Sequence, residues 1–258
     1  MEEDSGPGGF LLLALFADIH SNLAAFDACL AHARSRGAER TALLGDLVGY
    51  AAEAGEVVDR AVALSREGGL AVQGNHDAAI NPSSPHNYMN ETASAAIEWT
   101  RRSLEPGQKA WLAALPLIVR EEDVCLVHAT ANRPERFHYV DGPSAAWSSA
   151  EAAERPYTFC GHVHDQVLYF EREPARMGTL RPTPGVVIPV GRHRRWLAIV
   201  GSVGQPRDGN PDAAYALFDS ERQEIVFHRV PYDATRAQAR IREAGLPEFL
   251  AYRIGRGV

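Results

Sequence analysis

Short hydrophobic runs alternate with longer amphipathic stretches in the first third of the chain. The runs predict strands at residues 10–17, 40–44 and 70–73. Apolar residues at helical spacing begin at Leu23, after Ser21 or Asn22 as a helix cap, and recur around Val57. This β-α-β-α-β order predicts parallel strands joined by right-handed crossovers.

The middle of the chain departs from this alternation. Pro82 and Pro85 interrupt it, and a pair of helices is expected at 92–104 and 107–115. We interpret residues 81–116 as a helical insertion beside the site and not as a separate domain. Two more strands are predicted at 124–127 and 157–160, with a helix at 144–154 capped by Ser144.

Short strands separated by turn residues dominate the C-terminal part. They are predicted at 166–171, 185–189, 195–200, 213–219 and 224–229. We expect them to form a second, more antiparallel sheet, followed by a helix at 234–244 with Asp233 as its cap. The expected α/β (α+β) fold is a single domain over residues 10–258, with two packed sheets and helices outside, after a disordered tail of residues 1–9.

Composition narrows the class of protein. The 258 residues, 45% hydrophobic and 23% charged, are typical of a soluble globular chain with a substantial core. The net charge of −7 argues against general nucleic-acid binding, although bound metal ions would still attract an anionic substrate. The three cysteines form no Cys-x-x-Cys pair and are expected to be buried thiols in a reducing compartment.

Membrane association is not expected from the sequence. Residues 10–16 are the only segment that resembles the hydrophobic part of a signal peptide, and the residues before them are acidic and Gly-rich instead of basic. No stretch approaches the roughly 20 apolar residues of a spanning helix. We therefore expect a cytoplasmic protein.

Five polar motifs follow these runs. They are Asp18-Ile19-His20, Gly45-Asp46, Gly74-Asn75-His76-Asp77, His128 and Gly161-His162-Val163-His164. Nearly all come directly after a predicted strand, and strands of one sheet end side by side, so their side chains are expected to meet at one edge. Carboxylate, amide and imidazole groups are ligands for divalent metals, and Asp46 could bridge two of them. The pattern predicts a binuclear hydrolase centre.

In this order, the motifs resemble the calcineurin-like metallophosphoesterase superfamily, whose pattern is D-x-H, G-D, G-N-H-[DE], H and G-H-x-H. The segment 201–208 is also similar to the C-terminal signature of its small prokaryotic branch of phosphodiesterases and diadenosine tetraphosphatases. The resemblance implies a four-layer α/β/β/α sandwich of two mixed sheets flanked by helices.

The resemblance also implies a role for each residue of the motifs. One metal would be held by Asp18, His20 and His164, the other by Asn75, His128 and His162, with Asp46 bridging. The metals would be manganese, iron, zinc or nickel. His76 would bind no metal and would stabilise or protonate the leaving oxygen, and Asp77 would orient it through a carboxylate–imidazole hydrogen bond. A water or hydroxide between the metals would attack phosphorus in line.

Loop side chains are candidates for binding the substrate. Arg133 closely follows His128, His193 lies in a loop, and Arg207 lies in the Gly-rich segment, where it could equally pair with Asp208. The remaining histidines include His32 and His228, which are expected at the surface.

The expected reaction is hydrolysis of a phosphodiester or phosphomonoester. The expected partner is a small phosphorylated compound, with nucleotides among the candidates, and the oligomeric state stays open. Two alternatives keep the same fold: a catalytically silent metal-binding scaffold and a protein serine/threonine phosphatase. A metal-dependent amide hydrolase ranks below them, because its His-x-His pair usually lies on the first strand of an eight-fold barrel.

Overall fold

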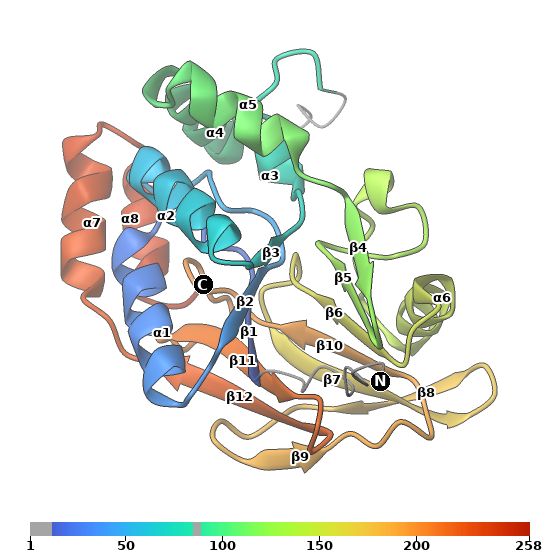
Figure 1. The fold of residues 1–258 in the computed structure, drawn as a ribbon. Helices are drawn as coiled ribbons and strands as arrows, with labels where there is room; N and C mark the ends of the chain where they lie inside the picture. Colours follow the sequence, from blue (N-terminus) through green and yellow to red (C-terminus); the bar gives the residue numbers. More distant parts are fainter. Residues whose placement is uncertain (1–11, 85–88) are drawn as a thin grey trace, which may run out of the picture.

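The computed structural model describes residues 12–84 and 89–258. Within them, two mixed six-stranded sheets pack against each other, and helices cover their outer faces (Figure 1). This is the α/β/β/α sandwich that the resemblance implied. The disordered tail expected for residues 1–9 lies outside the described residues.

The first sheet contains the three N-terminal strands in one half and three C-terminal strands in the other. Its order is β3-β2-β1-β11-β12-β9. Parallel pairing joins β1, β2 and β3, as expected, whereas β1 pairs with β11 in antiparallel fashion. The strands are β1 (Leu12–Phe16), β2 (Arg40–Leu43), β3 (Leu70–Ala71), β9 (Val187–Pro189), β11 (Ala213–Asp219) and β12 (Glu224–Val230).

The second sheet begins in the middle of the chain. Its order is β4-β5-β6-β10-β7-β8, with β6 parallel to both β5 and β10. The strands are β4 (Ile118–Glu121), β5 (Val124–Val127), β6 (Tyr157–Cys160), β7 (Gln166–Glu173), β8 (Arg176–Leu180) and β10 (Trp196–Val200). Apolar side chains from both sheets fill the space between them, where the rings of Phe159 and Phe218 lie 5.0 Å apart.

The prediction that the C-terminal strands form a second sheet of their own was wrong. Strands β9, β11 and β12 join the first sheet, and only β7, β8 and β10 join the second. The reason is the burial of β1, whose consecutive residues Leu15 and Phe16 are fully buried on opposite faces of the sheet. A strand buried on both faces lies inside a sheet and needs a partner along each edge to satisfy its backbone.

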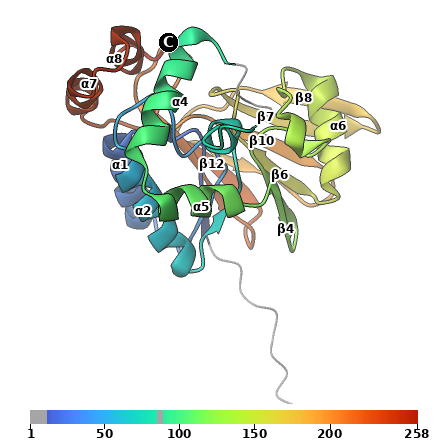
Figure 2. The ribbon, with the colours of Figure 1, turned by 90° about the horizontal axis from the view of Figure 1, so that it is seen from above.

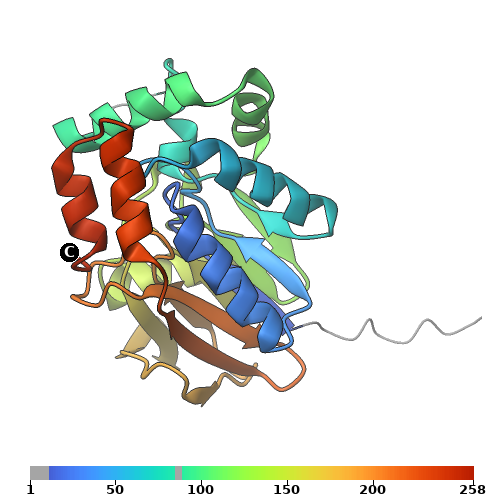
Figure 3. The same cartoon turned by 90° about the vertical axis from the view of Figure 1, so that its left-hand side faces the viewer.

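Helices cover the outer face of each sheet. Helices α1 (Leu23–Ser35) and α2 (Ala54–Arg66) pack on the first sheet, with α7 (Ala234–Glu243) and α8 (Glu248–Ile254) beside them (Figure 3). Helix α6 (Pro143–Ala153) packs on the second sheet. No helix within residues 12–84 and 89–258 is long and apolar enough to cross a membrane.

The helices of the middle segment lie at one end of the sandwich. They are α3 (Asn75–Ala78), α4 (Glu91–Ser103) and α5 (Pro106–Ala114). Seen from above, α4 and α5 lie over the middle of the molecule, between α7 and α8 on one side and α6 on the other (Figure 2). Because α5 contacts both α2 and α3, the segment is packed onto the body of the molecule.

Most predicted caps are correct. The side chain of Asn22 accepts a hydrogen bond from the backbone of Ala25 at 3.2 Å, and Asp233 caps α7 in the same way. Ser144 does not cap α6, because the helix already begins at Pro143, a residue that favours the first helical position.

The surface position expected for His228 was also wrong, whereas His32 is partly exposed. His228 is buried and stacks on Tyr215, and His32 is partly buried with its Nδ1 2.6 Å from the Tyr215 hydroxyl. Helix α1, which carries His32, packs on this part of the sheet, and the rings of His32 and His228 lie 5.0 Å apart. The three cysteines are free and buried, as expected.

Candidate metal centre

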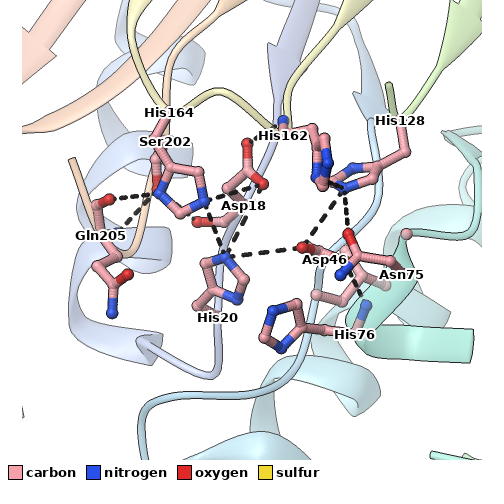
Figure 4. Close-up of polar contacts among 12 residues, drawn as sticks. Asp18, His20, Asp46, Asn75, His76, His128, His162, His164, Ser202 and Gln205 are labelled. Carbon is pink, nitrogen blue, oxygen red and sulfur yellow. Dashed lines mark hydrogen bonds and ion pairs between the residues drawn. The ribbon is translucent and has the colours of Figure 1, made fainter. Parts of the chain in front are cut away.

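Seven side chains of the five motifs converge where strands of both sheets end (Figure 4). The first sheet contributes Asp18 and His20 after β1, Asp46 after β2 and Asn75 at the start of α3. The second sheet contributes His128 after β5, and His162 and His164 after β6. All but Asn75 are buried, so the centre lies within the protein at the junction of the two sheets.

The backbone at the ends of these strands turns sharply. Five of the seven residues have positive φ angles between 49° and 72°: Asp18, His20, Asp46, His162 and His164. Left-handed conformations in residues other than glycine are uncommon and tend to cluster at functional sites. The loop after β1 is fixed to the loop after β2, since the backbone of His20 donates to the carbonyl of Asp46 at 3.0 Å.

Two glycines allow the loops to approach closely. A Cβ atom on Gly45, whose φ is +83°, would lie 2.8 Å from Nδ1 of His128. A Cβ atom on Gly74 would overlap the backbone nitrogen and the carboxylate of Asp46. Both positions need glycine because another side chain would displace a residue of the centre.

The first ligand group contains Asp18, His20 and His164. The Nε2 atoms of the two histidines lie 3.3 Å apart, and Oδ1 of Asp18 lies 3.5 Å from Nε2 of His164 and 3.8 Å from Nε2 of His20. Three possible ligand atoms thus face one small volume, an arrangement suited to one cation.

The second ligand group is built around His128. Its Nε2 lies 3.1 Å from Nδ1 of His162, 3.2 Å from Oδ1 of Asn75 and 3.4 Å from Oδ2 of Asp46. The same Oδ2 atom lies 3.8 Å from Nε2 of His20, in the first group. Asp46 therefore lies between the two groups, where a bridging ligand would be.

Backbone carbonyls fix the orientation of three histidines. The Nδ1 atoms of His20, His128 and His164 lie 3.2, 2.8 and 2.6 Å from the carbonyl oxygens of Val48, Leu44 and Gln205. A carbonyl can only accept, so each Nδ1 carries the proton and donates it. This leaves Nε2 of each ring as the atom that faces the ligand groups, as in metal-binding histidines.

The two aspartates follow the same design. One oxygen of each carboxylate accepts a backbone N–H at 2.8 Å, from His162 to Asp18 and from His76 to Asp46. The other oxygen faces the ligand groups, and Oδ1 of Asp18 is buried without a hydrogen bond. A buried carboxylate oxygen opposite two imidazole lone pairs is costly unless a cation binds between them, so these residues fit a metal.

Burial and mutual charge shift the pKa values of the centre. Burial lowers the pKa of His20 and His164 well below the ordinary value, and that of His162 to about 3. Burial also raises the pKa of Asp18 to about 7. The pKa of His128 is lowered by burial, but the Asp46 carboxylate outweighs this and raises it to about 9.

These pKa values predict that metal binding releases protons. Without metal at pH 7, His128 holds its proton and Asp18 is about half protonated, and both must lose their protons to act as ligands. We expect between about one and two protons released per pair of ions, and an affinity that rises from pH 6 to 9. Calorimetric titration in buffers of different ionisation enthalpy measures the release. An affinity independent of pH would contradict the prediction.

A family model for the calcineurin-like phosphoesterase superfamily domain matches residues 11–223. The chain belongs to this superfamily. It is 32% identical over 249 residues to the uncharacterized protein MJ0912 of Methanocaldococcus jannaschii, which covers 94% of this chain and 97% of that protein.

Solved structures agree with this membership. The crystal structure of a metallophosphoesterase from Sphaerobacter thermophilus is 33% identical, with a TM-score of 0.86, over 96% of this chain and 99% of that one. The hypothetical protein PH1004 from Pyrococcus horikoshii shares the fold at 20% identity and a TM-score of 0.77, over 96% of this chain and 99% of that one. The family resemblance seen in the motifs is thus confirmed.

His76 lies beside the two ligand groups of the metal centre. Its ring is 4.8 Å from the ring of His20 and 4.6 Å from that of Tyr50, and its Nδ1 is buried without a hydrogen bond. Gly49, with a φ of +94°, makes room for it, because a Cβ atom there would lie 2.5 Å from Nδ1. Burial lowers the pKa of His76.

Asp77 does not orient His76 as the superfamily resemblance implied. Its Oδ1 accepts from the backbone of Leu47 at 2.9 Å and of Val48 at 3.2 Å, and its Oδ2 accepts from Gly74 at 2.9 Å. Adjacent residues of a helix point in different directions, so the two side chains diverge. Asp77 instead holds the loop after Asp46, including the carbonyl that orients His20.

The three candidate substrate-binding residues lie in different places. Arg133 is exposed on the loop after β5. The structure does not bring His193 to the centre: it is exposed just before β10, at the end of the strand opposite to the motifs, where Arg194 contacts it. Arg207 lies over the ring of Tyr50, which packs against His20. The pairing considered with Asp208 is not formed, because Asp208 pairs with Arg229.

Sequence reasoning missed three residues that support the centre of this phosphoesterase fold. Ser202 donates to the carbonyl of Asp18 at 2.8 Å, Gln205 accepts from His164, and Tyr50 packs edge-on against His20 at 4.6 Å. Ser202 and Gln205 belong to the segment 201–208, which is similar to the C-terminal signature of the superfamily. That similarity could have indicated their role. Tyr50 carries no such signal.

Proposed function

We propose that this protein is a phosphoester hydrolase that uses two divalent metal ions. The observation that carries the proposal is the position of Asp46, whose Oδ2 faces both ligand groups, at 3.4 Å from His128 and 3.8 Å from His20. Membership of the calcineurin-like phosphoesterase superfamily supports it. We propose manganese, iron, zinc or nickel as the metals, since mixed Asp, Asn and His ligands suit all four.

In this proposal, each residue of the centre would have a separate role. Asp18, His20 and His164 would hold one ion, Asn75, His128 and His162 the other, and Asp46 both. Bound ions would polarise the phosphoryl oxygens and lower the pKa of a water molecule that attacks phosphorus in line. The imidazole of His76, whose ring lies 4.8 Å from that of His20, would supply a hydrogen bond or proton to the leaving oxygen.

The substrate that we propose is a small phosphodiester or phosphomonoester, with nucleotides among the candidates. An enzyme is favoured over a silent scaffold by His76, because it is buried against the centre while neither ligand group needs it. A scaffold would have no use for such a side chain. A protein serine/threonine phosphatase is the alternative activity.

Metal-stripped protein restored with each metal in turn tests the proposal. We expect hydrolysis of bis-p-nitrophenyl phosphate, p-nitrophenyl phosphate or a dinucleoside polyphosphate with at least one metal. Preferential hydrolysis of a phosphoprotein would favour the alternative phosphatase. If metal binds and none of these compounds is hydrolysed, the scaffold is the better description.

Replacing His76 by alanine tests its role. We expect kcat to fall by about 10²- to 10³-fold, which is typical for loss of a general acid, while metal content stays unchanged. Metal analysis beside steady-state kinetics measures both. His193→Ala serves as the matched control, because this histidine lies away from the centre, and its kcat should equal that of the unmodified protein. Undiminished hydrolysis by His76→Ala would refute the role.

A further inference from the structure

One aromatic side chain lies both at the surface of the protein and against a residue of the metal centre. The ring of Tyr139 stacks on the ring of His162, with the ring centres 4.0 Å apart and the planes 21° from parallel. His162 belongs to the second ligand group and is buried, whereas Tyr139 is 55% exposed. Because His162 covers one face of the tyrosine ring, the exposed area lies on the opposite face and at the edges.

The loop that carries Tyr139 is anchored on both sides of this residue. It follows β5, and near its start the backbone of Ala131 donates to Oγ of Ser149 in α6 at 2.9 Å. Directly after Tyr139, Val140 is buried in the apolar cluster that α6 forms with the second sheet. A ligand that stacks on the open face of the ring would therefore not have to order the loop first, which lowers the cost of binding.

Support of His162 alone does not account for the exposure of Tyr139. Phe137, in the same loop, packs edge-on against the neighbouring ligand His128 with the ring centres 5.9 Å apart, and it is 6% exposed. The loop thus supports one histidine of the second ligand group with a buried ring and the other with a ring that has an open face. Covering that face with a second planar ring would remove apolar area from water and add a stacking contact.

The place of this open face limits what it would bind. Aromatic side chains stack on planar rings, and every nucleobase offers such a ring. Because His162 belongs to the second ligand group, the planar ring would be part of a compound whose phosphoryl group lies at the centre. A nucleotide joins a phosphoryl group to a planar base through its sugar, whereas phosphoserine and phosphothreonine have no planar ring. The position of Tyr139 therefore favours a nucleotide.

We propose that Tyr139 binds the base of a nucleotide whose phosphoryl group lies at the metal centre. The base would stack on the face of the tyrosine ring opposite to His162, and His162 would remain a metal ligand. This inference rests on the proposed function and narrows its substrates to nucleotides. Stacking depends little on the identity of the base, so purines and pyrimidines would both bind, with purines favoured by their larger rings.

Binding to the metal-loaded protein tests this inference without relying on turnover. Calorimetry would compare the phosphonate analogues of AMP and of ribose 5-phosphate, in which a methylene group replaces the ester oxygen, so that neither is hydrolysed. We expect the AMP analogue to bind about tenfold more tightly, as stacking of one base on an aromatic side chain would allow. Tyr139→Leu keeps an apolar side chain without a planar face and should reduce this preference to about twofold or less.

Three further variants separate stacking of the base from support of His162. Tyr139→Phe keeps the ring and should keep the full preference, whereas Tyr139→Trp enlarges the ring and should increase it. Tyr252→Leu is the matched control, because Tyr252 is a similarly exposed tyrosine that stacks on Phe249 in α8, and it should keep the full preference. Metal analysis of each variant should give an unchanged content, since the backbone of His162 is also held by Asp18.

Three results would overturn the role of Tyr139: equal affinity of the unmodified protein for the two analogues, a full preference retained by Tyr139→Leu, or equal losses in Tyr139→Leu and Tyr252→Leu. If Tyr139→Leu lost its metal, Tyr139→Trp would decide, because a larger ring increases the preference only when the base stacks on it.

Failure of the proposed function gives a different result. A protein that hydrolyses no phosphoester but loses the preference with Tyr139→Leu would bind nucleotides at Tyr139 without being a hydrolase. A protein that hydrolyses phosphoesters but binds both analogues equally would be a hydrolase in which Tyr139 does not contact a base.

Discussion

Replacing Asp46 by alanine is expected to abolish hydrolysis and to leave at most one metal ion per chain. Oδ2 of Asp46 faces both ligand groups, so its loss removes a ligand and a negative charge from each. Loss of a residue that only orients a ligand already weakens metal binding by about 10- to 100-fold, and a shared ligand should cost more. We expect kcat to fall by at least about 10³-fold. Metal analysis and kinetics measure the two effects.

Two further variants show whether loss of the Asp46 charge causes the loss of metal and of hydrolysis. Asp46→Asn keeps an oxygen that can accept the backbone N–H of His76 and removes only the charge, so it should fold normally and still lose metal. Asp165→Ala removes an aspartate that directly follows His164 but pairs with Arg181, and it should behave like the unmodified protein. If Asp46→Ala bound two metal ions and hydrolysed the substrate at an unchanged rate, Asp46 would not be a ligand shared by the two metals.

Gly74→Ala is expected to destabilise the protein more than any other glycine substitution that we consider. The added Cβ would overlap the backbone nitrogen of Asp46 and its Oδ1, neither of which can move without shifting the loop after β2. We expect a loss of about 3 kcal/mol in the free energy of unfolding, at the upper end for overpacking. Urea denaturation in the presence of a chelator measures it without the contribution of metal binding.

Gly107→Ala is the control for this change. Gly107 lies in α5, and nothing lies within 4 Å of the position that its Cβ would take. Alanine there should stabilise the protein by about 0.5–1 kcal/mol, because it lowers the entropy of the unfolded chain. If Gly74→Ala were as stable as the unmodified protein, the loops at the centre would be less closely packed than described.

The candidate site could be predicted well from the sequence because its residues follow strand ends. The runs at 124–127 and 157–160 match β5 and β6, and their positions alone placed His128 and His162 at one edge. Strand partners were harder to predict. The pairing of β1 with β11 joins residues about 200 positions apart, and hydrophobic alternation does not specify which strand lies next to which.

The directions of side chains also could not be predicted from the sequence. Asp77 follows His76, and a carboxylate beside an imidazole suggested a hydrogen bond, but the short helix α3 turns the two apart. His193 lies in a polar loop like those of the site, yet that loop precedes β10, and the loop near the centre follows it. Whether a loop residue lies near the centre depends more on the end of the strand at which its loop lies than on the chemical type of the residue.

Each ligand group draws residues from both sheets, and this has a consequence for the stability of the whole molecule. Asp18 and His20 from the first sheet meet His164 from the second, and Asp46 and Asn75 meet His128 and His162. Bound ions would cross-link the two halves of the sandwich at one end, much as a disulfide cross-links two loops. The unfolded chain has no such preformed site, so the free energy of metal binding would add directly to that of folding.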